Sequence, residues 1–597
     1  MSDEQAIANE VESTIHPLEG QRRENRSAIE GVGGKPYGER SDGLLTLAEA
    51  RSLYDEAADL AHQESAAAIK EAKKANPEAS EDELPALVDG RPRVRVAGRV
   101  MLKRGQGKLL WMQLRDHTTA SARDVHGGAE DDQGEGDGGE EGAREASAFA
   151  AMLTVDLQIA VSKKDVAEPG FEIAKQADLG DVVVVEGALM KTKMGEITVW
   201  AEKVEMGTKS IAPPPGKWSG LQDVELRYRR RYIDLYSNPD AMQVFRLRSQ
   251  IVQAIRDRLV TLGFLEVDTP TLQSQAGGAA ARPFMTHMNA LSIDLFMRIA
   301  PELYLKRLLV GGMPRVFEFS KNFRNEGVDK SHNPEFTSLE VYQAFGNYDS
   351  MADLAEGLIR AAALRVRDAL RGENQSTSAV VDSELPSDLS LEPLGAGELV
   401  LPFGDLKIDY GVAFDHVTFA ELFERALGFS MEDEARALGE AKKRGLKTTG
   451  EKGEALAPVL VVNELFEEVA EPTLDPARPT FVRDYPSALS PLTRPKADHP
   501  EIAERWDLFM GGMEIGPAYT ELNDPDIQEA KFREQLAGID DEESTFRNFD
   551  ADFVNALKVG MPPAGGLGLG IDRLCMLLLN QRTIRDVILF PMMRPEV

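Results

Sequence analysis

Two runs of alternating hydrophobic and polar residues, separated by a polar stretch that contains a glycine, stand out between Arg315 and Tyr342. Alternate side chains of a strand point to the same face, so each run presents one set of residues to one side. In the first run this set is Val316, Glu318, Ser320, Asn322 and Arg324; in the second it is Phe336, Ser338, Glu340 and Tyr342. The pattern predicts a β-hairpin with a long loop.

The hairpin carries residues that suit a nucleotide. If both faces line one cleft, that cleft holds a guanidinium, an aromatic ring and a carboxylate. Arginine binds phosphate, an aromatic ring stacks on a base, and polar groups reach ring nitrogens. The loop adds Asn325, Glu326, Lys330, His332 and Asn333. An ordinary charged hairpin would show the same alternation, so the pattern alone leaves both interpretations open.

Five shorter runs of strand-like alternation lie upstream, at residues 93–102, 109–116, 148–160, 181–192 and 196–206. Short strands at this spacing predict a small barrel of the OB type, with a generic small β domain as the alternative. Residues 127–145 are acidic and rich in glycine, and cannot bury apolar surface. We interpret about 120–146 as a disordered insertion in the barrel.

Helical and mixed patterns complete a multidomain α+β chain. Residues 1–90 read as a helical or loose extension with a helix over Leu45–Lys74, residues 91–212 as the barrel, and residues 213–597 as a larger domain. In the larger domain the pattern predicts a helix over Phe245–Leu262, a helix that begins near Glu302, and an insertion at about 372–400.

Two further segments carry candidate chemistry. A hairpin over Asp507–Thr520 turns at Gly511–Gly512 and brings Asp507 and Glu514 near each other, with Glu521 just beyond. Neighbouring carboxylates are costly unless a cation lies between them. Residues 565–580 form a glycine-rich strand followed by an apolar helix. Arg573 lies at that junction, where backbone N–H groups also favour a phosphate.

Composition and charge argue against several classes of protein. The net charge of −32 argues against a general nucleic-acid coat. The densest basic cluster, at Arg227, Arg229, Arg230 and Arg231, either contacts nucleic acid or lies on a helix and pairs with acids elsewhere. A single cysteine excludes a disulfide framework. No signal peptide and no apolar run of membrane-spanning length are visible, so we expect a cytosolic protein without a membrane partner.

Together these segments resemble a class II lysyl-tRNA synthetase of the bacterial type over about residues 91–597. The phrases FLEVDTP, RVFEFSKNFRNEG with HNPEFTSLEVY, and GLGLGIDRL match the three class II motifs in order. The phrases RIAPELYLKRL and RDVILFPMMRP resemble the lysine branch in particular. The resemblance implies an OB-fold anticodon-binding barrel followed by an antiparallel-sheet catalytic domain. It also implies lysine, ATP and tRNA(Lys) as substrates, with Mg²⁺ as cofactor.

The resemblance also assigns roles to residues. Arg324 and Arg573 are expected to be catalytic and, with four further residues, to bind ATP: Glu326, His332, Asn333 and Phe336. The lysine pocket is expected to consist of Gly278, Glu302, Glu340, Tyr342, Tyr519 and Glu521. Asp507 and Glu514 are expected to hold Mg²⁺, and Trp111 and Glu196 to contact the anticodon. Pro517 stands where the family usually has an Asn that contacts the amino acid, Asp507 replaces a more usual Glu, and Trp111 replaces a usual Phe.

Other activities share parts of this pattern. Aspartyl- and asparaginyl-tRNA synthetases have the same barrel and motifs, but Glu302, Glu340 and Glu521 favour a cationic amino acid. An enzyme that modifies a protein lysine would lack the barrel. A non-catalytic tRNA-binding paralogue would typically lose Arg324 or Arg573, and this chain has both. The resemblance implies a homodimer formed through the segment around Phe264–Pro270.

Overall fold

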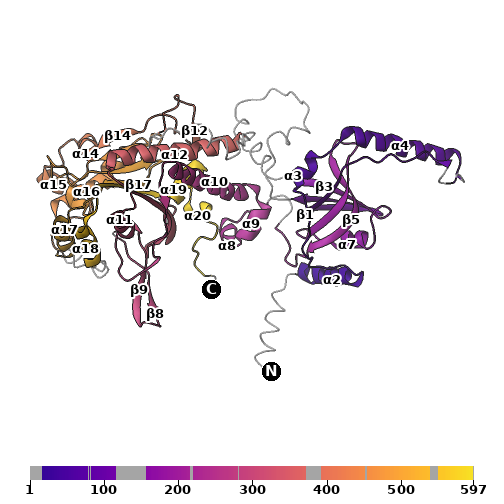
Figure 1. The fold of residues 1–597 in the computed structure, drawn as a ribbon, viewed down its shortest axis with the longest axis horizontal. Coiled ribbons are helices and arrows are strands. Elements are labelled where there is room, and N and C mark those ends of the chain that lie inside the picture. The colour runs from indigo at the N-terminus through magenta and orange to yellow at the C-terminus, as the bar shows by residue number, and fades with distance from the viewer. Residues whose placement is uncertain are drawn as a thin grey trace. The chain divides into compact units, whose positions relative to one another are not determined.

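The computed structural model describes residues 17–77, 80, 83–115, 156–215, 220–279, 281–371, 391–450, 453–537 and 549–595 (Figure 1). The chain divides into two compact units, Met1–Gln243 with Arg371–Asn374, and Val244–Leu370 with Gln375–Val597. The insertion predicted at about 120–146, and most of the one at about 372–400, lie outside the described residues.

The first unit is built on a closed five-stranded barrel in the order β1-β2-β3-β5-β4, which confirms the OB-type prediction. Its strands are β1 (Arg93–Gln106), β2 (Leu109–Arg115), β3 (Asp156–Ser162), β4 (Val182–Lys191) and β5 (Ile197–Thr208), with helix α7 (Gly170–Gln176) between β3 and β4. Along β2, Leu110, Met112 and Leu114 are buried while Trp111 and Gln113 are partly exposed. This period of two fills the barrel interior and leaves Trp111 on its outer face.

Three N-terminal helices pack on the barrel: α2 (Pro17–Gly31), α3 (Leu47–Ser52) and α4 (Glu56–Ala75). Ile29, Leu47 and Ala50 are fully buried in the same hydrophobic cluster as the barrel strands. The single helix predicted over Leu45–Lys74 is instead two helices. The chain breaks between them because Asp55 caps the start of α4, where its side chain accepts a hydrogen bond from the backbone of Ala58.

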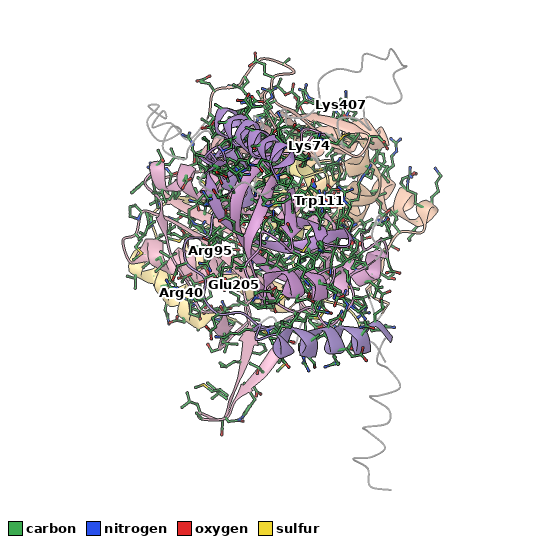
Figure 2. The ribbon with its side chains drawn as sticks, turned by 90° about the vertical axis from the view of Figure 1, so that its right-hand side faces the viewer. Arg40, Lys74, Arg95, Trp111, Glu205 and Lys407 are labelled. Atoms are coloured by element: carbon green, nitrogen blue, oxygen red, sulfur yellow. The ribbon has the colours of Figure 1, made fainter. Side chains whose placement is uncertain are left out.

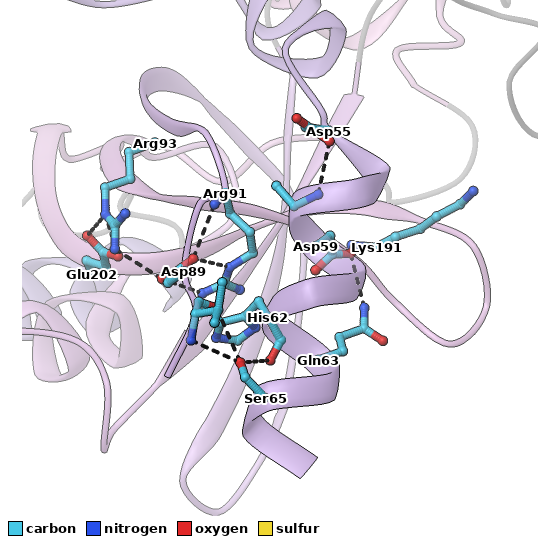
Figure 3. Close-up of polar contacts among 12 residues, drawn as sticks. Asp55, Asp59, His62, Gln63, Ser65, Asp89, Arg91, Arg93, Lys191 and Glu202 are labelled. Carbon is cyan, nitrogen blue, oxygen red and sulfur yellow. Dashed lines mark hydrogen bonds and ion pairs between the residues drawn. The ribbon is translucent and has the colours of Figure 1, made fainter. Parts of the chain in front are cut away.

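Polar contacts hold α4 against the barrel (Figure 3). The Asp59 carboxylate is buried and accepts a hydrogen bond of 2.8 Å from the backbone N–H of Lys191. Further along, the Ser65 hydroxyl bonds with the backbone of Val88. Helices α2, α3 and α4 are therefore structurally part of the barrel unit.

Three of the four arginines in the basic cluster before the second unit are paired with acids. It lies on α8 (Val224–Arg229) and α9 (Arg231–Ser237). Arg227 and Arg231 lie 2.7 and 2.5 Å from Asp234, and Arg229 lies 2.7 Å from Glu225. These pairs favour the structural interpretation of the cluster over nucleic-acid contact.

The second unit is organised by an eight-stranded sheet in the order β14-β15-β16-β17-β18-β11-β10-β6. The sheet is antiparallel except for the two edge pairs, β14 with β15 and β10 with β6. Its strands are β6 (Leu265–Glu266), β10 (Arg315–Phe323), β11 (Glu335–Ala344), β14 (Asp415–Thr418), β15 (Thr480–Arg483), β16 (Arg505–Met510), β17 (Met513–Thr520) and β18 (Ala564–Gly570). The prediction of an antiparallel-sheet domain is thus confirmed, with parallel strands at both edges.

Helices and two small sheets surround this sheet. The helices are α10 (Pro239–Thr261), α11 (Glu302–Val310), α12 (Tyr348–Leu370), α14 (Phe419–Leu427), α15 (Glu434–Arg444), α16 (Pro458–Leu465), α17 (Pro525–Ala537), α18 (Ala551–Gly560), α19 (Ile571–Leu578) and α20 (Ile584–Val587). The small sheets are β12 (Val400–Phe403) with β13 (Leu406–Asp409), and β7 (Leu272–Gln273), β9 (Ile293–Met297) and β8 (Met285–Met288). None of the described helices is both long enough and apolar enough to cross a membrane.

The hairpin that dominates the sequence forms as predicted, and its register brings the two predicted sets of side chains to one face. Asn322 lies opposite Phe336, and Glu318 lies opposite Glu340. Strand β18 pairs with β11 on one side and with β17 on the other. Side chains from β10, β11 and β17 therefore converge over a strand of glycines.

Candidate active site

A cavity of about 430 Å³ lies on one face of the large sheet. It brings together most of the residues predicted to bind ATP and lysine: Gly278, Glu302, Arg324, Glu326, His332, Asn333, Phe336, Glu340, Tyr342, Glu514, Tyr519 and Arg573. Asp507 and Glu521 are not among its lining residues. Trp111 and Glu196 belong to the barrel of the other unit.

Two backbone segments that line the cavity pass so close to acidic side chains that only glycine fits there. A Cβ on Gly566, in β18, would lie 1.9 Å from Oε1 of Glu521. Gly278 has φ +85°, and a Cβ there would press on the Cβ of Glu302 at 3.2 Å. Both positions therefore require glycine.

One end of the cavity is strongly acidic. Glu302 begins helix α11 and Glu340 lies on β11, and both line the cavity. Glu521, directly after β17, lies beside Gly566, which also lines it. The Tyr342 hydroxyl donates a hydrogen bond of 3.1 Å to Glu340. Oε1 of Glu521 is buried without a hydrogen-bond partner among the described residues. A buried, unpaired carboxylate oxygen is expensive, so this end of the cavity is suited to a cation.

A buried lysine already neutralises part of this charge. Lys306 is fully buried, with its Nζ 2.6 Å from Oε1 of Glu302 and 2.5 Å from Oε2 of Glu521. Lys306 and Glu302 are four residues apart on α11, so they share one face of the helix. Because both of its neighbours are carboxylates, Lys306 is not available to bind an acidic ligand.

The third acid, Glu340, has no lysine or arginine partner among the described residues, and its ionised form is disfavoured. Burial and the nearby carboxylate of Glu302 raise the pKa of Glu340 to about 8. Burial, together with Glu302 and Glu340, also raises the pKa of the Tyr342 hydroxyl well above its usual value. An ammonium group placed between them would favour the ionised form of Glu340.

The other end of the cavity is built for an anion and a flat ring. The Arg324 guanidinium lies 5.0 Å from the centre of the Phe336 ring. Nε of Arg324 and Oδ1 of Asn333 are buried without hydrogen-bond partners among the described residues. Such atoms indicate a ligand that supplies the missing acceptor and donor.

Arg573 is held from two sides at this end. Its Nη1 donates a hydrogen bond of 2.7 Å to the backbone oxygen of Glu514, and its Nη2 lies 2.9 Å from Nε2 of His332. His332 in turn bonds to Asp329 through Nδ1, at 2.8 Å. Asp329 had no role in the sequence prediction.

The predicted metal ligands differ in how available they are. Glu514 lines the cavity, whereas both oxygens of Asp507 accept hydrogen bonds from Arg505, at 2.9 and 2.7 Å. In the strand register Asp507 lies opposite Pro517, and Glu514 lies opposite Phe509. The described residues contain no group of three or more acidic, histidine or cysteine side chains arranged around a metal position. Mg²⁺ commonly takes one or two carboxylates plus substrate phosphates, so Glu514 fits this ion while Asp507 would first have to release Arg505.

A third acid, Glu471, lies near Asp507 and Glu514, and its negative charge also favours a cation at this place. Burial and the carboxylates of Glu514, Glu467 and Asp507 raise the pKa of Glu471 to about 7. Sequence reasoning missed Glu471, because it lies in the helical region after α16, far along the chain from Asp507 and Glu514.

The barrel carries a second, smaller candidate site. Trp111 projects from β2, opposite Arg104 of β1 and Ala160 of β3 (Figure 2). Glu196 is exposed at the turn between β4 and β5, with Nη1 of Arg51 at 3.9 Å. An aromatic ring on the outer face of such a barrel can stack on an unpaired base.

Sequence reasoning also missed Lys306 and Arg505, although a signal exists for each. Lys306 follows Glu302 by one helical turn, and Arg505 shares a strand face with Asp507 two residues later. No local signal links Lys306 to Glu521, which lies directly after β17, because only the folded sheet brings Glu521 to α11.

The family model described as tRNA synthetases class II (D, K and N) matches residues 223–594. The lysine–tRNA ligase of Pelotomaculum thermopropionicum is 42% identical over 513 residues, which cover 85% of this chain and 87% of the relative. That of Carboxydothermus hydrogenoformans is 40% identical over 518 residues, covering 86% and 91%. That of Pseudomonas fluorescens is 43% identical over 453 residues, covering 74% and 83%.

Proposed function

This chain belongs to the class II tRNA synthetases and is a ligase that joins lysine to tRNA at the expense of ATP, and from this premise we propose which residues perform each step. The observation that carries the assignment is the acidic end of the cavity, where Glu302, Glu340 and Glu521 meet with only one buried lysine among them. Lysine-dependent exchange of pyrophosphate into ATP, with other amino acids as controls, tests it. Exchange with aspartate or asparagine in place of lysine would contradict it.

The charge of the pocket supports lysine over aspartate. Three carboxylates and Lys306 leave two negative charges, and substrate lysine brings two ammonium groups. An aspartate pocket would need a cation that faces the side chain. Lys306 already has Glu302 and Glu521 as partners at 2.6 and 2.5 Å.

We propose that the reaction proceeds by positioning rather than through a protein nucleophile. The lysine carboxylate attacks the α-phosphorus of ATP, and pyrophosphate leaves. The terminal ribose hydroxyl of the tRNA then attacks the acyl carbon, and AMP leaves. Arg324 neutralises the α-phosphate and the activated carboxylate, while Arg573 and His332 hold the outer phosphates.

The other proposed contacts follow from the same cavity. Phe336 stacks on the adenine, with Arg573 on its opposite face, and Glu326 and Asn333 contact the adenosine. The lysine contacts are those at the acidic end: Gly278, Glu302, Glu340, Tyr342, Tyr519 and Glu521. Glu514 would hold Mg²⁺, with Asp507 as the second carboxylate. The ion would neutralise charge on the triphosphate.

Lysine binding is expected to depend on pH. Glu340 must be ionised to bind an ammonium group, yet in the empty pocket its pKa is raised to about 8. The KM for lysine should therefore fall by about tenfold for each pH unit from 6 towards 8 and then level off. Burial also raises the pKa of the neighbouring Glu521 to about 7, so the midpoint reports the pair of acids.

The measurement is the KM for lysine in pyrophosphate exchange at saturating ATP. Glu340→Gln, which cannot ionise, provides the control and should flatten the dependence near pH 8. A KM for lysine that is constant from pH 6 to 8 in the unmodified protein would contradict the proposed pairing.

We propose that the barrel binds the tRNA anticodon through Trp111 and Glu196. Trp111→Ala should weaken tRNA charging but not lysine-dependent exchange, because the exchange cavity is lined only by residues of the other unit. Base–aromatic stacking contributes about 1–3 kcal/mol per base, so the KM for tRNA should rise by about 5- to 150-fold. Trp200→Ala, on β5, which β3 separates from β2, is the matched control. An equal loss of exchange would contradict the anticodon assignment.

We propose further that the protein acts as a homodimer in the cytoplasm, where tRNA is charged for translation. Large hydrophobic side chains on and beside β6 and the hairpin β8–β9 are exposed in the single chain: Leu265, Leu272, Met285, Leu291 and Ile293. A second copy would cover them. Light scattering after gel filtration measures the oligomeric state, and Leu291→Asp should shift it towards the monomer.

A further inference from the structure

Asp329, in the loop between β10 and β11, is fixed so that it orients His332. Its Oδ1 accepts hydrogen bonds from the backbone N–H groups of Ser331 and His332, at 2.6 and 2.8 Å. Its Oδ2 lies 2.8 Å from Nδ1 of His332. Burial raises the pKa of Asp329, but the hydrogen bonds from Ser331 and His332 outweigh it and hold the pKa at about 2. Asp329 is therefore a carboxylate at neutral pH and can only accept hydrogen bonds.

The contacts of His332 define its tautomer. Nη2 of Arg573 lies 2.9 Å from Nε2 of His332, and a guanidinium can only donate. Nε2 must therefore carry the lone pair, and the ring proton must be on Nδ1, where it is donated to Asp329. In the absence of nucleotide His332 is thus neutral and accepts a hydrogen bond from Arg573.

When a nucleotide binds, Nε2 of His332 must donate a hydrogen bond instead of accepting one. Under the proposed function His332 and Arg573 hold the outer phosphates of ATP, and phosphate oxygens only accept. A ring nitrogen that faces them must carry a hydrogen, while Nδ1–H remains with Asp329. We propose that Asp329 is a positioning residue through which ATP binding takes up one proton from solvent onto Nε2 of His332. This inference rests on the proposed function.

Other charged groups face His332, and the sign of each charge decides whether it favours or disfavours a second proton on the ring. Arg573, on α19, disfavours a second ring proton until its charge is matched by phosphate. Asp329 favours that proton, as do the phosphates when they are bound. Arg324 and Glu326 line the same cavity with opposite charges. The change on binding is therefore set by the arriving phosphates, with Asp329 as the fixed counter-ion.

The test is isothermal titration of the full-length protein with ATP and Mg²⁺ at pH 8, without lysine. Titrations in HEPES and in Tris buffer, which differ in ionisation enthalpy, give the number of protons taken up. The outer phosphate of ATP is already ionised at this pH, since such groups titrate near 6. We expect uptake approaching one proton, and His332→Gln should abolish it.

Asp329→Asn keeps the size of the side chain and removes its charge. It should reduce proton uptake to near zero and weaken ATP binding by about tenfold or more, with the KM for lysine unchanged. Asp294→Asn is a matched control, because Asp294 forms the same contact with His287, at 2.7 Å, outside the cavity. That variant should behave as the unmodified protein.

The outcomes separate the two proposals. ATP binding without proton uptake, or uptake that persists in Asp329→Asn or in His332→Gln, would overturn this inference and leave the proposed function standing. Failure of the unmodified protein to bind ATP would overturn both.

Discussion

Glu340→Gln is expected to reduce lysine activation by roughly two to four orders of magnitude. Glu340 is the acid of the pocket that no lysine or arginine of the described residues pairs with, and Tyr342 already orients it. An ammonium group in a water-poor pocket needs a carboxylate partner. Losing one partner of a buried pair costs about 3–5 kcal/mol, and each 1.36 kcal/mol is about tenfold in rate.

The measurement is lysine-dependent pyrophosphate exchange, with the affinity for ATP determined separately. ATP binding should survive, because the proposed nucleotide contacts are on Arg324, His332, Phe336 and Arg573. Glu335→Gln is the matched control, since Glu335 is an exposed acid at the start of the same strand. Near-normal lysine activation in Glu340→Gln would reopen the aspartate-type alternative.

Lys306→Met is expected to destabilise the second unit by about 3–5 kcal/mol. The substitution keeps a long apolar side chain but leaves Glu302 and Glu521 buried with no counter-ion, and Lys306 is fully buried. Thermal unfolding followed by circular dichroism measures the loss. Lysine activation should fall as well, because the two acids lose their fixed orientation.

A second variant separates charge from packing. In Lys306→Met/Glu521→Met both members of one ion pair become apolar, so part of the lost stability should return, while Glu302 stays buried without its partner and lysine activation stays low. The surface pair of Lys558 and Glu529, at 3.6 Å with both side chains partly exposed, gives a control. Lys558→Met should change stability by less than about 1 kcal/mol. A loss of that small size in Lys306→Met would show that Lys306 is not the counter-ion.

The sequence predicted best what depends on a local period. The alternation in β10 and β11 fixed which side chains share a face, and the observed pairing of Asn322 with Phe336 confirms it. The five barrel strands followed from the same rule. Strands β12 and β13 were missed, because they are short and lie beside a low-complexity stretch.

Contacts between segments that lie far apart in the chain could not be predicted from the sequence. Helix α2 lies in the N-terminal extension that was predicted to be helical or loose, yet Ile29 is fully buried in the barrel core. Likewise, the ion pair between Glu521 and Lys306 joins residues that lie far apart in the chain, and no local pattern predicts it. Such contacts depend on which elements meet, and hydrophobic periodicity carries no information on that.

The position of α2 has a consequence for how the protein is made. Arg22 donates hydrogen bonds to the backbone of Leu179 and Ser210, and Tyr37 bridges to Thr208 at the end of β5. Helix α2 therefore cannot dock on the barrel until the ribosome has released nearly all of the barrel strands. Contacts of such long sequence separation form slowly. Until then the nascent chain exposes an unfinished barrel, and a truncation that begins at residue 91 would leave that surface open for good.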